Sequence, residues 1–485
     1  MVDAQSDLGL IGLAVMGKNL ILNFSDHGYS VSCWNRTPEK VQAFMEGDAK
    51  GHSIQGFHEI APFIASIKRP RKIILLVKAG DPVDQVIQEC LPHLEEGDIL
   101  IDGGNSYFLD TERREGELSQ KGILYVGCGV SGGELGARYG PSLMPGGNEK
   151  AWPEIQQMLQ DVSAKAEDGA PCCEWIGKGG AGHYVKMVHN GIEYGDIQLI
   201  CEAYDFMKRS MGLEEGEMSE IFAHWNDDVL NSYLIQITRD VLAYKDSDGK
   251  PLVTKILDEA GQKGTGRWTG ISALDEGVPL TLIQEAVMAR CLSAMKDERV
   301  RLSEHYQIEP KKLHGKDKKE VLTHLAQALY AAKIISYAQG FMLMRDAAKH
   351  YGWDLRFGEI AAIWRNGCII RSVFLDDITK AFKKDEQLEN LLFDDFFTEA
   401  ITHCLEGWRE LVGLGVQYGI PMPAMSSALA FFDGFTSGRL PANLLQALRD
   451  YFGAHTYHRV DGGDEAFHTN WTGQGGETSA GSYNA

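Results

Sequence analysis

"LGLIGLAVMGKNLILNFSDHGYSVSCWNRTPEK", residues 8–40, has the pattern of a buried strand, a tight turn, a helix and a second strand. We expect the helix to run to about His27 and the second strand to cover Val31–Trp34. The turn, Gly12-x-Ala14-x-x-Gly17, matches the dinucleotide-binding pattern except that alanine replaces its second glycine. Within a βαβ unit, this turn predicts a pyrophosphate site at the start of the helix, although alone it could be a chance turn.

The residues after the second strand bear on which dinucleotide would bind. An acidic residue there would hydrogen-bond the ribose of NAD, but this strand ends in Asn35-Arg36-Thr37. The planar cation of Arg36 suits a 2′-phosphate, and its neighbours add polar contacts. An exposed loop arginine is the alternative. The residue that selects the cofactor usually lies about 20 residues past the glycines, which is where Arg36 stands, so the sequence favours NADP over NAD.

Length and charge limit the class of protein. A chain of 485 residues predicts two or three domains, and a net charge of −21 argues against nucleic acid or an anionic membrane as the partner. Nine scattered cysteines without a C-x-x-C spacing indicate free thiols in a reducing compartment. The acidic N-terminus does not resemble a signal peptide, and no apolar run reaches about 20 residues. We expect a soluble, cytoplasmic protein.

Further strand-like runs end in glycine-rich or polar loops, as expected at the carboxyl edge of a parallel sheet. Asn105 follows one such run and could reach a nicotinamide ring or a substrate. Ser131-Gly132-Gly133 follows another, and its backbone N–H groups could approach an anion. Both loops could equally be simple turns.

Helical periodicity dominates from about Gly179 to Leu440. Near its start, "KMVHNGIEYG" places five chemically distinct side chains on one stripe of a helix: Lys186, His189, Asn190, Glu193 and Tyr194. A solvated polar face is the simplest interpretation. The alternative is that one small ligand contacts base, acid and amide together.

A faint internal repeat relates "MGLEEGEMSEIFAHW" to "YGWDLRFGEIAAIW" and pairs Gly212 with Gly352. At the same offset Ala326 takes the place of Lys186, and Lys333 takes the place of Glu193. The second copy therefore lacks the stripe, which indicates that helix packing does not require it.

"LDEAGQKGTGRWTG" places Lys263 and Thr265 between glycines. This segment is a candidate phosphate cradle, although it is not a Walker A loop, and a surface turn is equally compatible with it. The chain ends in a Gly-, Ser- and Thr-rich tail that alone would be disordered, although Trp471 and Tyr483 argue against that interpretation.

Together, "IGLAVMGKNL", "WNRT", "IDGGNS", "GVSGGELGARYGPSLMPGG", "KMVHNGIEYGDIQL", "ILDEAGQKGTGRW" and "NWTG" resemble the 6-phosphogluconate dehydrogenase family essentially end to end. The resemblance implies a Rossmann-like α/β domain at 1–178, an all-helical domain with internal duplication at 179–440, and a tail at 441–485 that reaches the partner subunit of a homodimer. It also implies metal-independent oxidative decarboxylation of 6-phospho-D-gluconate to ribulose 5-phosphate, with NADP as cofactor.

The resemblance further assigns roles to residues. Lys186 would be the general base and Glu193 the general acid. The residues that would bind substrate are Asn105, Ser131, Gly132, Gly133, His189, Asn190, Tyr194, Lys263, Thr265 and Arg290, with Arg449 and His455 from the other subunit. Those that would bind the cofactor are Gly12, Leu13, Ala14, Val15, Met16, Gly17, Asn35, Arg36, Thr37, Val77, Lys78, Ala79 and Asn105.

Two other functions fit parts of the sequence. A β-hydroxyacid dehydrogenase for an unphosphorylated acid would not need Lys263, Arg290 and Arg449 together. A dinucleotide-binding sensor without turnover would not need the Lys186–Glu193 pair.

Overall fold

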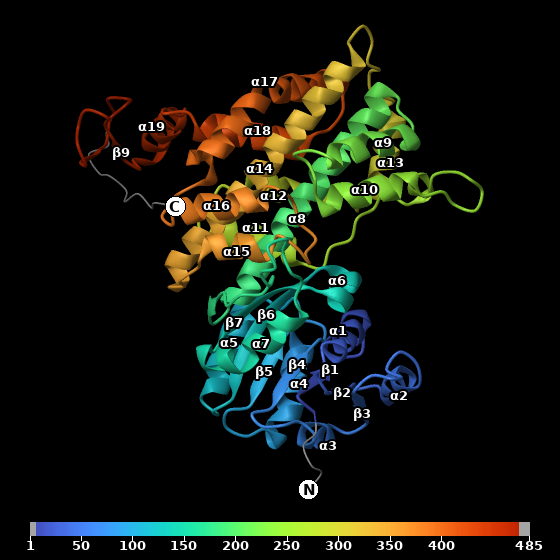
Figure 1. The fold of residues 1–485 in the computed structure, drawn as a ribbon. Helices are drawn as coiled ribbons and strands as arrows, with labels where there is room; N and C mark the ends of the chain where they lie inside the picture. Colours follow the sequence, from blue (N-terminus) through green and yellow to red (C-terminus); the bar gives the residue numbers. More distant parts are fainter. Residues whose placement is uncertain (1–5, 475–485) are drawn as a thin grey trace. The chain divides into compact units, whose positions relative to one another are not determined.

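The computed structural model describes residues 6–474 (Figure 1). They divide into two compact units, one ending at Ala428 and the other beginning at Leu429. The end of the expected tail, including Tyr483, lies outside the described residues. Among residues 6–474, no helix is long and apolar enough to span a membrane.

The first unit begins with an eight-stranded sheet in the order β3-β2-β1-β4-β5-β6-β7-β8. Its strands are β1 Leu8–Ile11, β2 Val31–Trp34, β3 Ile54–Phe57, β4 Lys72–Leu75, β5 Ile99–Asp102, β6 Leu124–Ser131, β7 Ser142–Gly147 and β8 Gly177–Lys178. Strands β1 to β6 are parallel, while β7 runs antiparallel to β6. The register pairs Leu8 with Val31 and Gly9 with Ile73. Helices connect the strands: α1 Val15–Asp26, α2 Pro38–Glu46, α3 Ile60–Ala65, α4 Asp81–Cys90, α5 Phe108–Ser119, α6 Gly133–Tyr139 and α7 Trp152–Val162.

The strands are short apolar runs, and β1, β2 and β5 are buried at every position. Continuous burial is expected where helices cover both faces of a parallel sheet. Two apolar clusters form the core, one containing Phe24 and Ile155 and the other Phe63 and Val86. The prediction of a Rossmann-like domain is confirmed.

Helices make up the rest of the first unit, which confirms the predicted change of class. They are α8 Ala181–Asp205, continued by a π-helical segment at Phe206–Met211, then α9 Glu215–Asn226, α10 Tyr233–Ala243, α11 Thr265–Asp275, α12 Thr281–Ser293, α13 Lys296–Tyr306, α14 Lys318–Tyr351, α15 Phe357–Ile363, α16 Leu375–Lys384, α17 Asp395–Tyr418 and α18 Pro423–Phe435. Helix α18 crosses the division into the second unit, which also holds α19 Ala442–Gly453, β9 Tyr457–His458 and β10 Ala466–Phe467.

Helix α8 connects the two parts of the first unit. It packs against β6 and β7 at its start and against α11, α12 and α14 along its length (Figure 1). Gly212 directly follows the helical run that contains α8, and Gly352 directly follows α14; both glycines have a left-handed backbone conformation. These two glycines are the ones that the internal repeat pairs, so the matching helix ends agree with the repeat seen in the sequence.

Candidate active site

The first part of the site lies between β1 and β4, where the order of the strands along the sheet reverses. Strand β1 leads through α1 to β2 on one side, whereas β4 leads through α4 to β5 on the other. Ligands of open α/β sheets bind at the carboxyl end of such strands. A cavity of about 140 Å³ lies here, lined by Ile11, Gly12, Trp34, Asn35, Arg36, Val77, Pro82 and Val86. It thus brings together four residues predicted from the sequence, Gly12, Asn35, Arg36 and Val77.

The turn after β1 requires glycine. Gly12 has a φ of +110°, and a Cβ at this position would lie 2.3 Å from the carbonyl oxygen of Leu76. The turn is fixed from β2, because the Leu13 N–H donates to Oδ1 of Asn35 at 3.0 Å. Ala14 precedes α1 and has no polar side chain to cap it. The N–H groups of the first helical turn therefore have no side-chain cap, and such N–H groups can bind an anion.

Arg36 lies at the rim of this cavity with its side chain 57% exposed. Its guanidinium donates to Oε1 of Gln85 at 3.3 and 3.4 Å and forms an ion pair with Glu89 at 3.2 Å. Both partners lie on α4, so the guanidinium of Arg36 is held beside the cavity. A ribose phosphate at this position would have to compete with Glu89 for Arg36.

The polar stripe of α8 is buried. Lys186, His189 and Asn190 are at most 7% exposed. His189 joins the stripe to the end of β6, with Nε2 3.1 Å from Oγ of Ser131. On the other side of the ring, Nδ1 lies 3.1 Å from Oδ1 of Asn190 and 3.4 Å from Nζ of Lys186. The solvated-face interpretation is therefore wrong.

Burial controls the protonation of these groups. It lowers the pKa of Lys186 from the ordinary value of 10.5, and the nearby Glu193 and Cys368 oppose the shift. It also lowers the pKa of His189 well below 6.5, with Lys186 adding to the effect. Gly129 on β6 allows this close packing, since a Cβ there would lie 2.4 Å from Cβ of Lys186. The result is a neutral imidazole beside an amine that loses its proton more readily than an exposed lysine does.

Glu193 and Tyr194 continue the stripe beyond His189. Burial raises the pKa of the half-buried Glu193 from 4.5, while Lys186 and Arg290 oppose the rise. Arg290 on α12 stacks on the Tyr194 ring, with Cζ 3.5 Å from the ring centroid, and donates to the carbonyl oxygen of Gly261 at 3.2 Å.

The Gly261–Thr265 loop is therefore held next to the stripe. Thr265 is buried at the first position of α11, and Lys263, two residues earlier, is exposed. Thr265 thus lies in the first turn of α11, close to two cations: Lys263 is two residues earlier in the chain, and Arg290 bonds to the same loop. This arrangement is compatible with a phosphate cradle.

Asn105 is exposed on the loop after β5. This loop is anchored to α8 by His183, a residue not singled out from the sequence. The His183 ring lies 2.6 Å from Oγ1 of Thr111 through Nδ1 and 3.1 Å from the Asp102 carbonyl oxygen through Nε2. Lys78, in the loop after β4, is also exposed.

Sequence reasoning also missed the segment around residues 363–368. The indole of Trp364 meets the His189 ring edge-on, with centroids 5.6 Å apart. The backbone N–H of Ser142 donates to the Gly367 carbonyl oxygen at 2.8 Å. Cys368 contributes to the electrostatic environment of Lys186. Because these residues lie far from the stripe along the chain, no local pattern identifies them.

Arg449 and His455 belong to the second unit. Arg449 lies on α19 and donates to Oε1 of Gln446 at 3.0 Å. The His455 ring meets Phe452 edge-on at 6.1 Å. Asp450 is fully buried and accepts hydrogen bonds from the N–H groups of Thr456, Thr469 and Trp471 at 2.9–3.0 Å. The loop after α19 thus has defined internal structure.

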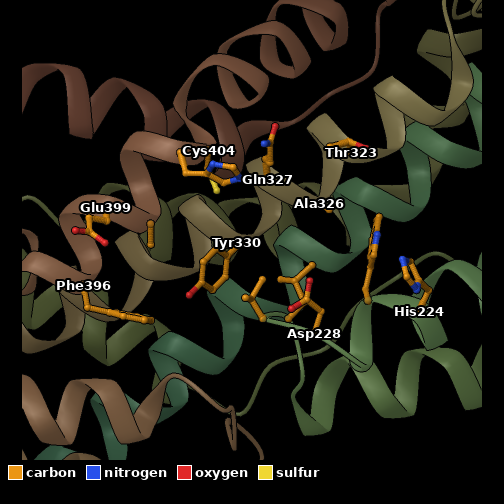
Figure 2. A pocket seen from close by; sticks show the side chains of 14 residues that line it. His224, Asp228, Thr323, Ala326, Gln327, Tyr330, Phe396, Glu399 and Cys404 are labelled. Atoms are coloured by element: carbon orange, nitrogen blue, oxygen red, sulfur yellow. The ribbon is translucent and has the colours of Figure 1, made fainter.

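A cavity of about 480 Å³ between α9, α14 and α17 lies apart from the stripe (Figure 2). Tyr330, Phe396 and Trp225 supply aromatic walls, and Asp228 and Glu399 supply carboxylates. Among the described residues that line it there is no lysine or arginine. This lining is unsuited to an anionic ligand, unlike the surroundings of the stripe.

Comparisons with known proteins show which family the chain resembles. Residues 7–177 match the family described as "NAD binding domain of 6-phosphogluconate dehydrogenase", and residues 182–471 match "6-phosphogluconate dehydrogenase, C-terminal domain". The chain is 62% identical to "6-phosphogluconate dehydrogenase, decarboxylating" of Candida albicans, over 99% of this chain and 95% of that protein. It is 57% identical to the human protein of the same name, over 99% of this chain and 100% of that protein.

A solved structure also resembles the chain closely. It is described as "Plasmodium falciparum 6-phosphogluconate dehydrogenase in its apo form, in complex with its cofactor NADP+ and in complex with its substrate 6-phosphogluconate". The TM-score is 0.93 at 45% identity, covering 96% of this chain and 100% of that chain.

Proposed function

The chain belongs to the 6-phosphogluconate dehydrogenase family, and we propose that it converts 6-phospho-D-gluconate to D-ribulose 5-phosphate and CO2 while reducing NADP to NADPH. The observation that carries this proposal is the buried arrangement of Lys186, His189, Asn190 and Ser131, with Glu193 one turn further along the same helix. A base, an acid and uncharged hydrogen-bonding groups can then contact one small molecule.

NADP fits the first part of the site. The uncapped start of α1 and the Gly12 turn would hold the pyrophosphate, and Arg36 with Asn35 and Thr37 would hold the 2′-phosphate. Leu13, Val15, Met16, Gly17, Val77, Lys78, Ala79 and Asn105 would complete the cofactor contacts. The chemistry that NADP supplies when bound is acceptance of a hydride.

Lys186 is the general base in this proposal. Oxidation of the carbon 3 alcohol requires removal of its hydroxyl proton. Lys186 can accept this proton only when its amine is neutral. Holding an ordinary lysine neutral at pH 7 costs about 4.6 kcal/mol. Burial of Lys186 shifts its pKa in the direction that reduces this cost.

The next step is loss of carbon dioxide. Oxidation at carbon 3 gives a β-keto acid, and its carboxylate leaves because the ketone accepts the electron pair as an enolate. Lys186 has just gained a proton and can donate it to that oxygen. The ammonium thus supplies the polarisation of the ketone that a metal ion supplies in other enzymes.

Glu193 completes the reaction as the general acid. The enediol must gain a proton at carbon 1, away from the oxygen that Lys186 serves. Glu193 lies about two turns beyond Lys186 along the same face of α8. The raised pKa of its carboxyl group favours the protonated form that this step requires.

The remaining groups orient the substrate. Ser131, the backbone of Gly132 and Gly133, His189, Asn190 and Asn105 would position the sugar acid. The phosphate would lie among Tyr194, Lys263, Thr265 and Arg290. These local cations allow a protein of net charge −21 to hold an anionic substrate.

The assembly we propose is a cytoplasmic homodimer, in which Arg449 and His455 of one subunit complete the phosphate site of the other. In each chain, residues 1–178 would bind NADP, residues 179–440 would carry the substrate site and dimer contacts, and residues 441–485 would form the exchanged tail. A candidate phosphate-binding pair on a separate compact unit supports this arrangement.

The direct test is NADPH formation from 6-phosphogluconate, with NAD as a parallel cofactor and an unphosphorylated sugar acid as a parallel substrate. We expect strong reduction of NADP with the phosphorylated acid alone. Equal rates with the unphosphorylated acid would instead identify a general β-hydroxyacid dehydrogenase, and a preference for NAD would refute the role of Arg36.

A further inference from the structure

A buried ion pair lies one helical turn beyond Glu193. Asp196 on α8 and Lys333 on α14 are 2% and 4% exposed, and Lys333 donates to Oδ2 of Asp196. Tyr337 stands beside the pair: its hydroxyl donates to the Ile370 carbonyl oxygen at 2.8 Å and lies 3.5 Å from Oδ2 of Asp196. The pair therefore has a fixed geometry in the interior.

Stability alone does not account for this pair. Removing two charges from water is expensive, and apolar residues of similar size commonly stabilise a protein as well or better. The second oxygen of Asp196, Oδ1, is buried and has no hydrogen-bond partner within residues 6–474. Such an unsatisfied oxygen adds to the cost of keeping the carboxylate ionised.

The ion pair of Asp196 and Lys333 lies close to Glu193, the proposed general acid. Asp196 follows Glu193 by three residues, so their side chains leave the same face of α8, with Cβ atoms about 5–6 Å apart. In the internal repeat, Lys333 occupies the position that corresponds to Glu193. The second copy thus has a cation, Lys333, where the first copy has the acid. This cation forms the ion pair with Asp196, which lies one turn from Glu193.

Several charges and titratable groups act on Glu193. Lys186 on the same helix and Arg290 on α12 favour its ionised form, whereas Asp196 opposes ionisation and adds to the effect of burial in raising its pKa. Cys368, after α15, is coupled to Glu193, and its own pKa is raised to about 12, so it remains a neutral thiol. Burial also raises the pKa of Asp196 itself from 3.8, while Lys333 and the Tyr337 hydroxyl oppose the rise, so the ion pair is what favours the ionised form of Asp196. Asp196 is therefore the carboxylate that offsets the two cations.

We propose that Asp196 is a positioning residue for Glu193: held ionised by Lys333, it directs a negative charge at Glu193 and keeps that acid protonated against Lys186 and Arg290. This inference rests on the proposed role of Glu193 as the acid that protonates the enediol. Lys333 acts through Asp196 and contacts no reacting atom.

The test compares the pH dependence of kcat in wild type and Asp196→Asn, with saturating 6-phosphogluconate and NADP. If the charges are as far apart as the Cβ atoms, about 6 Å, two unit charges at an effective dielectric constant of about 20 shift each other's titration by about two pH units. Because the Asn variant removes a like charge, Glu193 should lose its proton at lower pH. We expect the alkaline limb of kcat to move down by about one pH unit or more, with little change in KM.

Two further variants separate this effect from loss of folding. Asp196→Asn with Lys333→Met removes both charges, so it should regain stability. Because the positive charge of Lys333 offsets part of the field of Asp196 in wild type, the double variant should keep only part of the shift of the limb. Glu215→Gln breaks another ion pair with a buried carboxylate, the one with Lys208 at 3.0 Å near the end of α8. This control should lower stability and leave the pH profile unchanged.

An alkaline limb that stays in place in Asp196→Asn would overturn the proposal, as would a limb in the double variant that coincides with that of wild type. If the single variant does not fold, the double variant decides alone. Failure of wild type to oxidise 6-phosphogluconate would instead refute the proposed function, so the two failures are distinguishable.

Discussion

Replacing Lys186 with methionine separates its catalytic role from its structural role. Methionine keeps much of the length and the apolar stem of lysine, which packs directly over Gly129, but cannot accept a proton. Within residues 6–474, the hydrogen bond of the Nζ atom is a long contact of 3.4 Å with His189, so the loss of structure should be small. A positioned general base contributes about 10²- to 10⁴-fold to a rate, or about 2.7–5.4 kcal/mol. We expect kcat to fall by this amount.

The same variant should not be less stable than wild type. Folding moves Lys186 from water into a site that lowers its pKa below 10.5. At a pH between the folded-state pKa and 10.5, the amine is therefore protonated in the unfolded chain and neutral in the folded protein. Wild-type stability therefore falls as the pH decreases through that window. Methionine has no titratable group at this position. Within that window, the stability of the variant relative to wild type should therefore rise by about 1.4 kcal/mol for each unit by which the pH decreases.

The assays are NADPH absorbance for kcat and denaturant unfolding from pH 7 to 10 for stability. Binding of NADP to the Gly12 turn is the control and should be unchanged. A variant that keeps more than a tenth of wild-type kcat would refute the role of Lys186 as base. A stability difference independent of pH would refute the electrostatic reasoning.

Two further predictions concern the cofactor and the acid. Arg36→Ala should raise KM for NADP by about 10- to 100-fold, since hydrogen bonds to charged groups contribute about 1.5–3 kcal/mol, and should leave kcat nearly unchanged; steady-state kinetics with NADP and NAD would check this, and an unaltered KM would place the 2′-phosphate elsewhere. Glu193→Gln keeps the shape of the side chain but removes its titratable proton, so in a single turnover ribulose 5-phosphate should appear about 10²- to 10⁴-fold more slowly while NADPH still forms; equal appearance of the two products would exclude Glu193 as the acid.

The features predicted well from the sequence are local. The run of residues 8–40 contains the strand, the turn and the helix that build the cofactor site, and β2 lies where it was expected. The stripe on α8 follows from helical spacing alone. Spacing cannot show whether a polar stripe faces solvent or the interior, because that depends on β6, α11 and α12, which pack against α8.

The features that were not predicted depend on long-range packing. Trp364 and Cys368 approach the stripe from a distant part of the chain. The repeat identifies Lys333 only as a substitution, and no local pattern identifies its partner Asp196, because a lone aspartate on a helix is usually solvated. The competition of Glu89 for Arg36 likewise depends on where α4 packs.

The most direct test of the proposed chemistry is to titrate the amine of Lys186 itself. NMR of ¹³C-labelled lysine, assigned with the methionine variant, would follow its ε-carbon in the unreactive complex with NADPH and 6-phosphogluconate. We predict that this resonance reports a largely neutral amine in the pH range of activity. The amine of Lys186 should therefore titrate at a lower pH than the exposed lysines do. A resonance that stays in the ammonium position until exposed lysines titrate would contradict the role of Lys186 as the base.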